Sequence, residues 1–234
     1  MTDSIRILRP IQHLVLATVI ATACAPPQAR GGSIILGDSG WEAIWDSSLD
    51  SLVDITVDNV TADAVYIEKS AEFTGAPGPG GFPSIAIVFR QIAADAVRQV
   101  VINDEIITNS TGVDWTDFHI EVLNDGDAAF NPALTDASGF GGGFSTSPFD
   151  HQMFGDGDTS FWVDGFGLGA GGGDAIVEAG DVWFPGIGPG ELYIDVTTQP
   201  SAPFTLFALK ETPTPEPATC LLMLVGAAIL ARRR

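Results

Sequence analysis

Short runs of β-forming residues, separated by glycine and proline, dominate this chain from residue 52 onward. In one run Phe118, Ile120 and Val122 alternate with His119 and Glu121, as in a strand with one buried and one solvent-facing side. Similar runs occupy residues 52–57, 65–67, 85–89, 100–107, 161–163, 192–196 and 204–209. Segments rich in glycine and proline interrupt regular structure at 75–83, 139–143, 165–173 and 185–190. This spacing argues against a mainly helical fold.

About eight short strands with turns between them predict a mainly β domain over residues 31–210. The expected architecture is a single antiparallel β-sandwich of the jelly-roll or immunoglobulin-like type, with loops rich in glycine and proline. In the run 100–107, Asn103 and Asp104 interrupt the apolar pattern, which predicts a β-bulge. Near-helical spacing occurs over residues 90–100, but that stretch is short and has no cap.

Charge restricts the possible partners. The chain carries 10 Lys and Arg against 30 Asp and Glu, a formal net charge of −20. Residues 31–211 contain only Lys69, Arg90, Arg98 and Lys210 against 28 carboxylates, and no Lys or Arg occurs between residues 99 and 209. Such a surface repels phosphate backbones, so we exclude nucleic acid as a partner. A hydrophobic content of 45% indicates a folded core rather than disorder.

Cysteine is confined to the two ends of the chain, at Cys24 and Cys220. The predicted domain therefore has no disulfide, no cysteine metal site and no thiol nucleophile.

Residues 1–30 are typical of a secretory signal peptide that forms a helix during export. Twelve uncharged, mainly apolar residues at 14–25 are flanked by arginines and contain the small-x-small site Ala21-Thr22-Ala23. We expect signal peptidase to act here. The alternatives are a buried N-terminal helix and lipidation of Cys24, which the small residue Ala21 disfavours.

The C-terminal end has three parts. A proline-rich spacer at 211–217 precedes fourteen uncharged residues at 218–231, and Arg232, Arg233 and Arg234 follow. As a helix those fourteen residues measure about 21 Å, short of a hydrocarbon core of about 30 Å. Residues 218–234 therefore predict a short transmembrane helix that holds the protein only transiently, with its arginines on the cytoplasmic side.

The order Pro215-Glu216-Pro217, apolar helix and arginine cluster resembles the PEP-CTERM sorting signal. This resemblance covers about residues 213–234. It implies an exosortase as processing partner and a producing cell that makes extracellular polysaccharide. The same signal is attached to many unrelated domains, so it implies nothing direct about residues 31–210.

Candidate catalytic residues are few. Gly37-Asp38-Ser39 is similar to the nucleophile segment of GDS-type esterases, but no Asp-x-x-His pair follows late in the chain. A turn at the start of the domain is the favoured interpretation. His119 and His151 are interpreted as surface histidines, with His119 on the polar side of its strand. No catalytic residue is predicted.

Aspartate-rich loops offer weak calcium ligands at Asp156, Asp158 and Asp164, and a second such loop lies at 124–127. Neither matches an EF-hand, and solvated turn aspartates are the alternative. The aromatic residues Trp115, Phe161, Trp162 and Trp183 either form part of the core or supply a sugar-stacking platform.

Together these features predict an exported protein of the cell surface or extracellular matrix, with a non-enzymatic structural or adhesive role associated with exopolysaccharide. The alternative is a carbohydrate-binding module, either Ca²⁺-dependent or without a cofactor. A secreted hydrolase is the third hypothesis.

Overall fold

The computed structural model describes residues 31–78, 81–124, 126–137, 143–155, 157–165, 175–186 and 190–215. The predicted signal peptide at 1–30 and the predicted transmembrane helix at 218–234 lie outside these residues, as do Glu216 and Pro217 of the sorting motif. Within the described ranges, no helix is both long enough and apolar enough to span a membrane.

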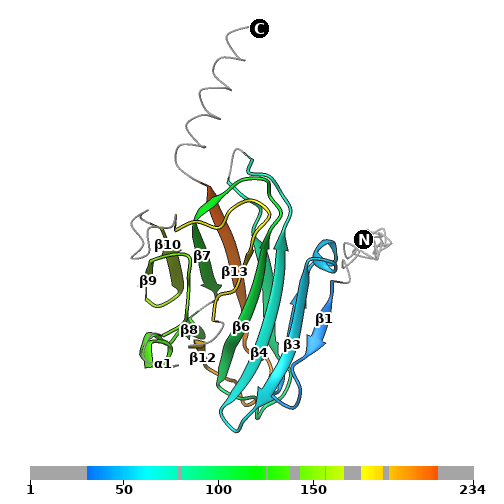
Figure 1. The fold of residues 1–234 in the computed structure, drawn as a ribbon. Helices are drawn as coiled ribbons and strands as arrows, with labels where there is room; N and C mark the ends of the chain where they lie inside the picture. The colour runs from blue at the N-terminus through cyan, green and yellow to red at the C-terminus, as the bar shows by residue number, and fades with distance from the viewer. Residues whose placement is uncertain are drawn as a thin grey trace, which may run out of the picture.

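Two β-sheets make up the described chain (Figure 1). The seven-stranded sheet has the order β1 (Ser33–Ile35), β2 (Trp41–Trp45), β5 (Ile85–Gln91), β13 (Leu206–Pro215), β7 (Trp115–Leu123), β10 (Ser160–Asp164) and β9 (His151–Gly155). The six-stranded sheet contains β3 (Val53–Val60), β4 (Ala64–Phe73), β6 (Gln99–Asn109), β12 (Leu192–Val196) and β8 (Ala128–Phe130), with β11 (Val182–Trp183) paired to β6. Helical structure is limited, among the described residues, to the 3₁₀ turn η1 (Ser47–Leu49) and the helix α1 (Pro132–Ala137). The prediction of a mainly β domain is confirmed.

The expectation of purely antiparallel pairing is wrong at one place, because β4 and β6 are parallel. After β4 the chain crosses to the other sheet and forms β5, and it then returns to form β6 beside β4. Strand β6 therefore runs in the same direction as β4. Residues 92–98, at the centre of the near-helical stretch, form the β5–β6 connection, and their apolar members Ala96 and Val97 are buried against the core.

The predicted bulge is present in β6. Ile67 pairs with Ile102 and Glu68 pairs with Asp104, so Asn103 is left over in the register. The extra residue changes which positions face inward, because Ile102 is buried before the bulge and Glu105 is buried after it. An acidic side chain is thereby turned into the core.

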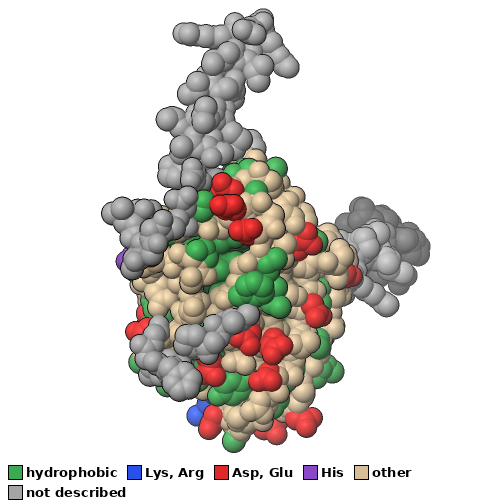
Figure 2. Space-filling view, viewed as in Figure 1, with side chains coloured by type: hydrophobic (Ala, Val, Ile, Leu, Met, Phe, Trp, Pro, Cys, Tyr) green, Lys and Arg blue, Asp and Glu red, His purple; other side chains and the backbone are tan. Residues whose placement is uncertain are grey.

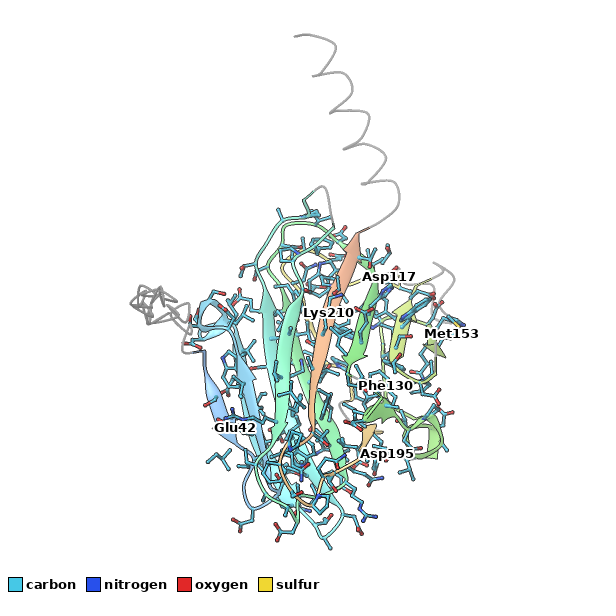
Figure 3. All side chains as sticks on the ribbon, turned by 180° about the vertical axis from the view of Figure 1, so that it is seen from behind. Glu42, Asp117, Phe130, Met153, Asp195 and Lys210 are labelled. Carbon is cyan, nitrogen blue, oxygen red and sulfur yellow. The ribbon has the colours of Figure 1, made fainter. Side chains whose placement is uncertain are left out.

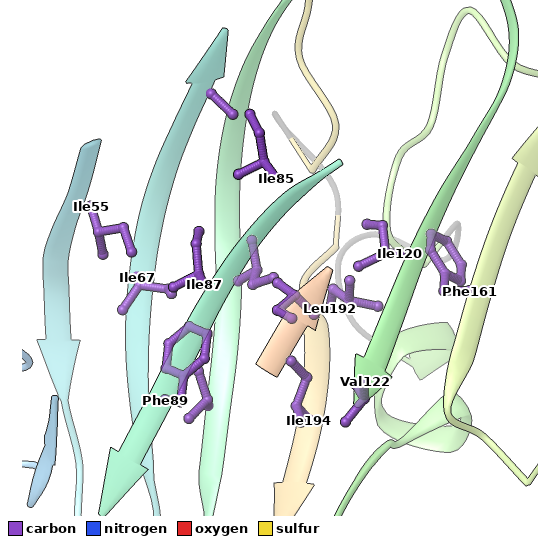
Figure 4. Close-up of a cluster of buried hydrophobic side chains, with 14 of the residues drawn as sticks. Ile55, Ile67, Ile85, Ile87, Phe89, Ile120, Val122, Phe161, Leu192 and Ile194 are labelled. Carbon is purple, nitrogen blue, oxygen red and sulfur yellow. The ribbon is translucent and has the colours of Figure 1, made fainter. Parts of the chain in front are cut away.

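One hydrophobic core lies between the two sheets (Figure 4). Ile67 and Ile194 enter it from the six-stranded sheet, and Phe89 and Val122 enter it from the seven-stranded sheet. Aromatic side chains of the two layers contact each other edge to face. The ring centroids of Phe73 and Trp115 are 5.4 Å apart, and those of Phe118 and Trp183 are 5.1 Å apart. The sheets therefore pack face to face.

Three charged residues also lie in this core and form a buried ion triad. Lys69 Nζ on β4 lies 3.2 Å from Glu105 Oε1 on β6 and 2.7 Å from Glu211 Oε1 on β13. Lys69 and Glu105 come from neighbouring strands of one sheet, and Glu211 comes from the other sheet. The triad links the two layers and, with one cation and two carboxylates, has a net charge of −1 when fully ionised.

Burial and charge act in opposite directions on this triad. Burial lowers the pKa of Lys69, but the two carboxylates outweigh it, so the pKa of Lys69 is raised. For Glu105 burial is the largest effect and exceeds the opposing attraction of Lys69, so its pKa is raised to about 7.

Strand β13 continues five residues beyond position 210, where the sequence placed the end of the domain. Glu211 joins the buried triad, and residues 212–215 pair with β7. Proline fits the strand at Pro213 because the other neighbour, β5, ends its pairing at Glu211, so one side of β13 needs no further backbone donor. The first half of the predicted spacer is thus part of the sheet.

Replacing Lys69 tests the triad directly. We expect Lys69→Met to lower the free energy of unfolding by about 3–5 kcal/mol, because it leaves two carboxylates buried without a cation. The matched control is Lys210→Met on the outer face of the seven-stranded sheet, where the pair with Glu121 is partly exposed and the expected loss is about 0–1 kcal/mol. Chemical denaturation measures both values, and equal losses would contradict the role assigned to Lys69.

The raised pKa of Glu105 also predicts a dependence on pH. Between pH 4.5, the ordinary value, and about 7 the folded chain binds more protons at this carboxyl than the unfolded chain does, so its contribution to stability falls as pH rises. We therefore expect the stability of the wild type, relative to Glu105→Gln, to decrease across this window. Thermal unfolding of both proteins at matched ionic strength measures the difference, and a difference independent of pH would refute the assignment.

Candidate functional site

The outer face of the seven-stranded sheet collects the side chains that alternate with the buried ones on its strands. On β7 these are Asp117, His119 and Glu121, whereas Phe118 and Ile120 point into the core. Neighbouring strands add Thr212 and Lys210 from β13, Trp162 and Asp164 from β10, and Met153 and His151 from β9. Figure 3 shows Glu42, Lys210, Asp117 and Met153 spread across this sheet.

An aromatic row crosses four of these strands and consists of Met153, Trp162, His119 and Thr212. Each member lies directly opposite the next in the strand register. The rings of Trp162 and His119 stack at 5.1 Å with an interplanar angle of 12°. Trp162 remains 38% exposed and Met153 43% exposed, so part of both side chains is open to solvent.

Every carboxylate so far placed on this outer face has a basic partner. Asp117 Oδ1 lies 3.4 Å from His119 Nε2, and Asp164 Oδ1 lies 3.3 Å from His151 Nδ1. Lys210 Nζ donates to Glu121 Oε2 at 2.6 Å, and Arg90 on β5 pairs with Glu42 on β2. We call this surface, with its four pairs, the paired-charge face.

The outer face of the six-stranded sheet is different, because its carboxylates contact neutral groups. Glu72 accepts a hydrogen bond from Ser110 at 2.6 Å, Asp58 accepts one from Asn103 at 3.4 Å, and Asp195 accepts from Gln99 and Asn131. Figure 2 shows acidic side chains across this view and Lys or Arg only at its lower edge. In a strongly acidic protein, the paired-charge face is thus the one on which each of the four carboxylates above has a basic neighbour, a lysine or arginine for Glu121 and Glu42 and a histidine for Asp117 and Asp164.

A cavity of about 590 Å³ lies at one end of the six-stranded sheet. Arg98 lines it together with Asp63, Asp127 and Asp195, so carboxylates outnumber the cation. Asp195 already accepts hydrogen bonds from Gln99 and Asn131. The cavity has neither an aromatic surface nor a balanced charge among its described lining residues.

The structure separates the described calcium candidates. Asp158 lies in the β9–β10 turn with a φ of 60°, whereas Asp164 ends β10 and pairs with His151. The strand from Ser160 to Asp164 alone spans roughly 13 Å, so Asp158 and Asp164 do not share one ion. Asp156 lies outside the described residues. In the part of the chain that the structure describes, no three His, Cys, Asp or Glu side chains are grouped to hold a metal ion.

The Gly37-Asp38-Ser39 segment forms the turn between β1 and β2, as expected. Ser39 is buried, and its Oγ accepts a hydrogen bond from the backbone N–H of Trp41 at 3.2 Å. Its hydroxyl therefore acts within the turn. The two histidines lie on β7 and β9: His119 faces outward as expected, and His151 is the first residue of β9.

The four aromatic candidates divide between core and surface. Trp115, Phe161 and Trp183 are buried, and only Trp162 faces outward. The alternation of side chains along a strand predicts the outward position of Trp162, because it lies between the inward positions Phe161 and Val163. The contribution of Met153 could not be found from the sequence, since it depends on the pairing of β9 with β10.

Comparison of the chain with protein-family models, with curated proteins and with solved structures finds no match. Its function is therefore inferred from the aromatic row and from the charges around it.

Proposed function

We propose that this chain is an exported, non-enzymatic protein of the cell surface or extracellular matrix that binds polysaccharide through the aromatic row. The proposal joins the adhesive role and the carbohydrate-binding role expected from the sequence. The scaffold would be a β-sandwich of the jelly-roll or immunoglobulin-like type, with one sheet face serving as the binding surface. The observation that carries it is the exposed, stacked Trp162.

Trp162 has the properties of a sugar platform. A sugar ring presents an apolar C–H face that covers an indole, while its hydroxyl groups need polar partners at the edge. Stacking on His119 restricts the indole, so little rotamer freedom is lost on binding. Asp117 lies beside His119 on β7, close to the stacked rings, and supplies a polar partner. The surface is the open outer face of a sheet, which suits a polymer better than a small molecule.

The distribution of charge also favours the paired-charge face as the binding surface. A polysaccharide with acidic groups is repelled by the unpaired carboxylates elsewhere on the protein. On the paired-charge face each of the four carboxylates has a basic neighbour, which reduces the repulsion that an incoming weakly acidic polymer meets there.

Polysaccharide binding tests this proposal. We expect Trp162→Ala to weaken retention in affinity electrophoresis against exopolysaccharide from the producing cells by about tenfold or more, because a desolvated tryptophan anchor is lost. The control is Phe184→Ala, which removes a 46% exposed aromatic side chain outside the paired-charge face. Both variants should keep the thermal unfolding temperature of the wild type. Equal retention of the wild type and Trp162→Ala would refute the site.

Export and sorting form the second part of the proposal. Signal peptidase would remove residues 1–30, and an exosortase would act at or near Pro215-Glu216-Pro217. The support is the order of the sequence pattern at both ends. The strand β13 ends at Pro215, so the folded sheet reaches the first residue of the sorting motif. Until cleavage, a helix at 218–234 would hold the protein in the membrane.

Intact-mass measurement tests the processing. Protein from its own cells should lack the N-terminal segment up to a cut between about Ala23 and Arg30, and in cells with active exosortase it should also lack residues 221–234. Cells without the exosortase provide the control and should retain the tail. A mature species that still carries residues 221–234 in the presence of exosortase would show that the tail is a membrane anchor.

A further inference from the structure

The paired-charge face carries an apolar band beside the aromatic row. Leu123, Ala208, Val88 and Ile44 lie directly opposite one another across β7, β13, β5 and β2. In the next row, Leu206 and Ile35 flank the Arg90–Glu42 pair. Six apolar side chains therefore cover a continuous part of this face.

These side chains point away from the core. On β13 the buried residues are Phe207 and Leu209, so Ala208 lies on the opposite side of the sheet. The three largest exposures are those of Leu123 at 48%, Leu206 at 55% and Ile35 at 62%. A contiguous apolar patch of this kind on a soluble domain marks an interaction surface.

We infer that a second copy of this chain docks on the apolar band, with the two seven-stranded sheets face to face. The charge distribution favours a second copy of the chain as the partner. With a net charge of −20 per chain, two copies repel each other through any surface that carries unpaired carboxylates. On this face Arg90 balances Glu42 and Lys210 balances Glu121, so two copies approach without bringing unpaired carboxylates together.

Geometry agrees with a two-fold arrangement. A two-fold axis brings the same patch of both copies together, so the band meets an identical band. Two sheets pack face to face at a spacing of about 10 Å when apolar side chains fill the space between them. The aromatic row is outside the band, so self-association does not depend on polysaccharide binding.

The area of the apolar band sets the expected affinity of the dimer. Five strands at about 4.8 Å and two rows at about 6.8 Å give roughly 330 Å² per copy. A standard stable interface buries about 800 Å² per partner. The dimer is therefore weak and dependent on concentration, as suits a protein that is concentrated at a cell surface.

Sedimentation velocity of the full-length chain tests the inference. From about 10 µM to about 1 mM protein, the wild type should shift from monomer to dimer. Raising the salt from about 50 mM to about 500 mM should strengthen the dimer, because it screens the repulsion between acidic copies. We expect Leu206→Glu to weaken the dimer by about tenfold or more, because it places an unpaired carboxylate in the apolar contact.

The control is Ile106→Glu, which adds the same charge at a 45% exposed position on β6 of the other sheet. It should leave the dimer unchanged apart from the effect of one added charge. If Leu206→Glu lowers the unfolding temperature, Leu123→Glu at the end of β7 replaces it.

Three results would overturn the inference. The first is a wild type that stays monomeric at every concentration and salt. The second is an equal loss of dimer in Ile106→Glu and Leu206→Glu. The third is a monomeric wild type in which Leu206→Glu abolishes polysaccharide retention, which would assign the band to the polymer.

Discussion

The structure depends on a single lysine that is buried between two sheets. Lys69 holds Glu105 of its own layer and Glu211 of the opposite layer, and all three side chains are buried. Two carboxylates in the core are tolerable only with a cation between them, so the three strands that carry the triad must meet in one register. The bulge at Asn103 helps to form the triad, because it turns Glu105 inward.

This register also positions the outer surface. Since successive residues of a strand point to opposite sides, fixing Glu211 in the core places Lys210 on the paired-charge face. Lys210 then pairs with Glu121, and Thr212 lies opposite His119 in the aromatic row. Strand β13 thus carries both the buried Glu211 and the exposed Lys210, so the position of the proposed binding surface follows from the packing of the core.

Local pattern was enough to predict part of this fold. The alternation of Phe118, Ile120 and Val122 predicted β7 and its outward histidine, and the break at Asn103 predicted the bulge. The parallel pairing of β4 and β6 could not be predicted, because it depends on a crossover between sheets. Nothing near Lys69 in the sequence marks it as buried, since its two partners are 36 and 142 residues away. The charge pairs of the outer face, apart from Asp117 and His119, likewise join different strands.

The central claim is that the outer face of the seven-stranded sheet is the working surface of this protein. Hydroxyl-radical footprinting with and without exopolysaccharide tests it most directly, because tryptophan, methionine and phenylalanine side chains all react when they are exposed. The account predicts that Trp162 and Met153 are oxidised in the free protein and protected by the polymer, while Phe184 reacts equally in both. Protection of Phe184, with Trp162 and Met153 unchanged, would contradict it.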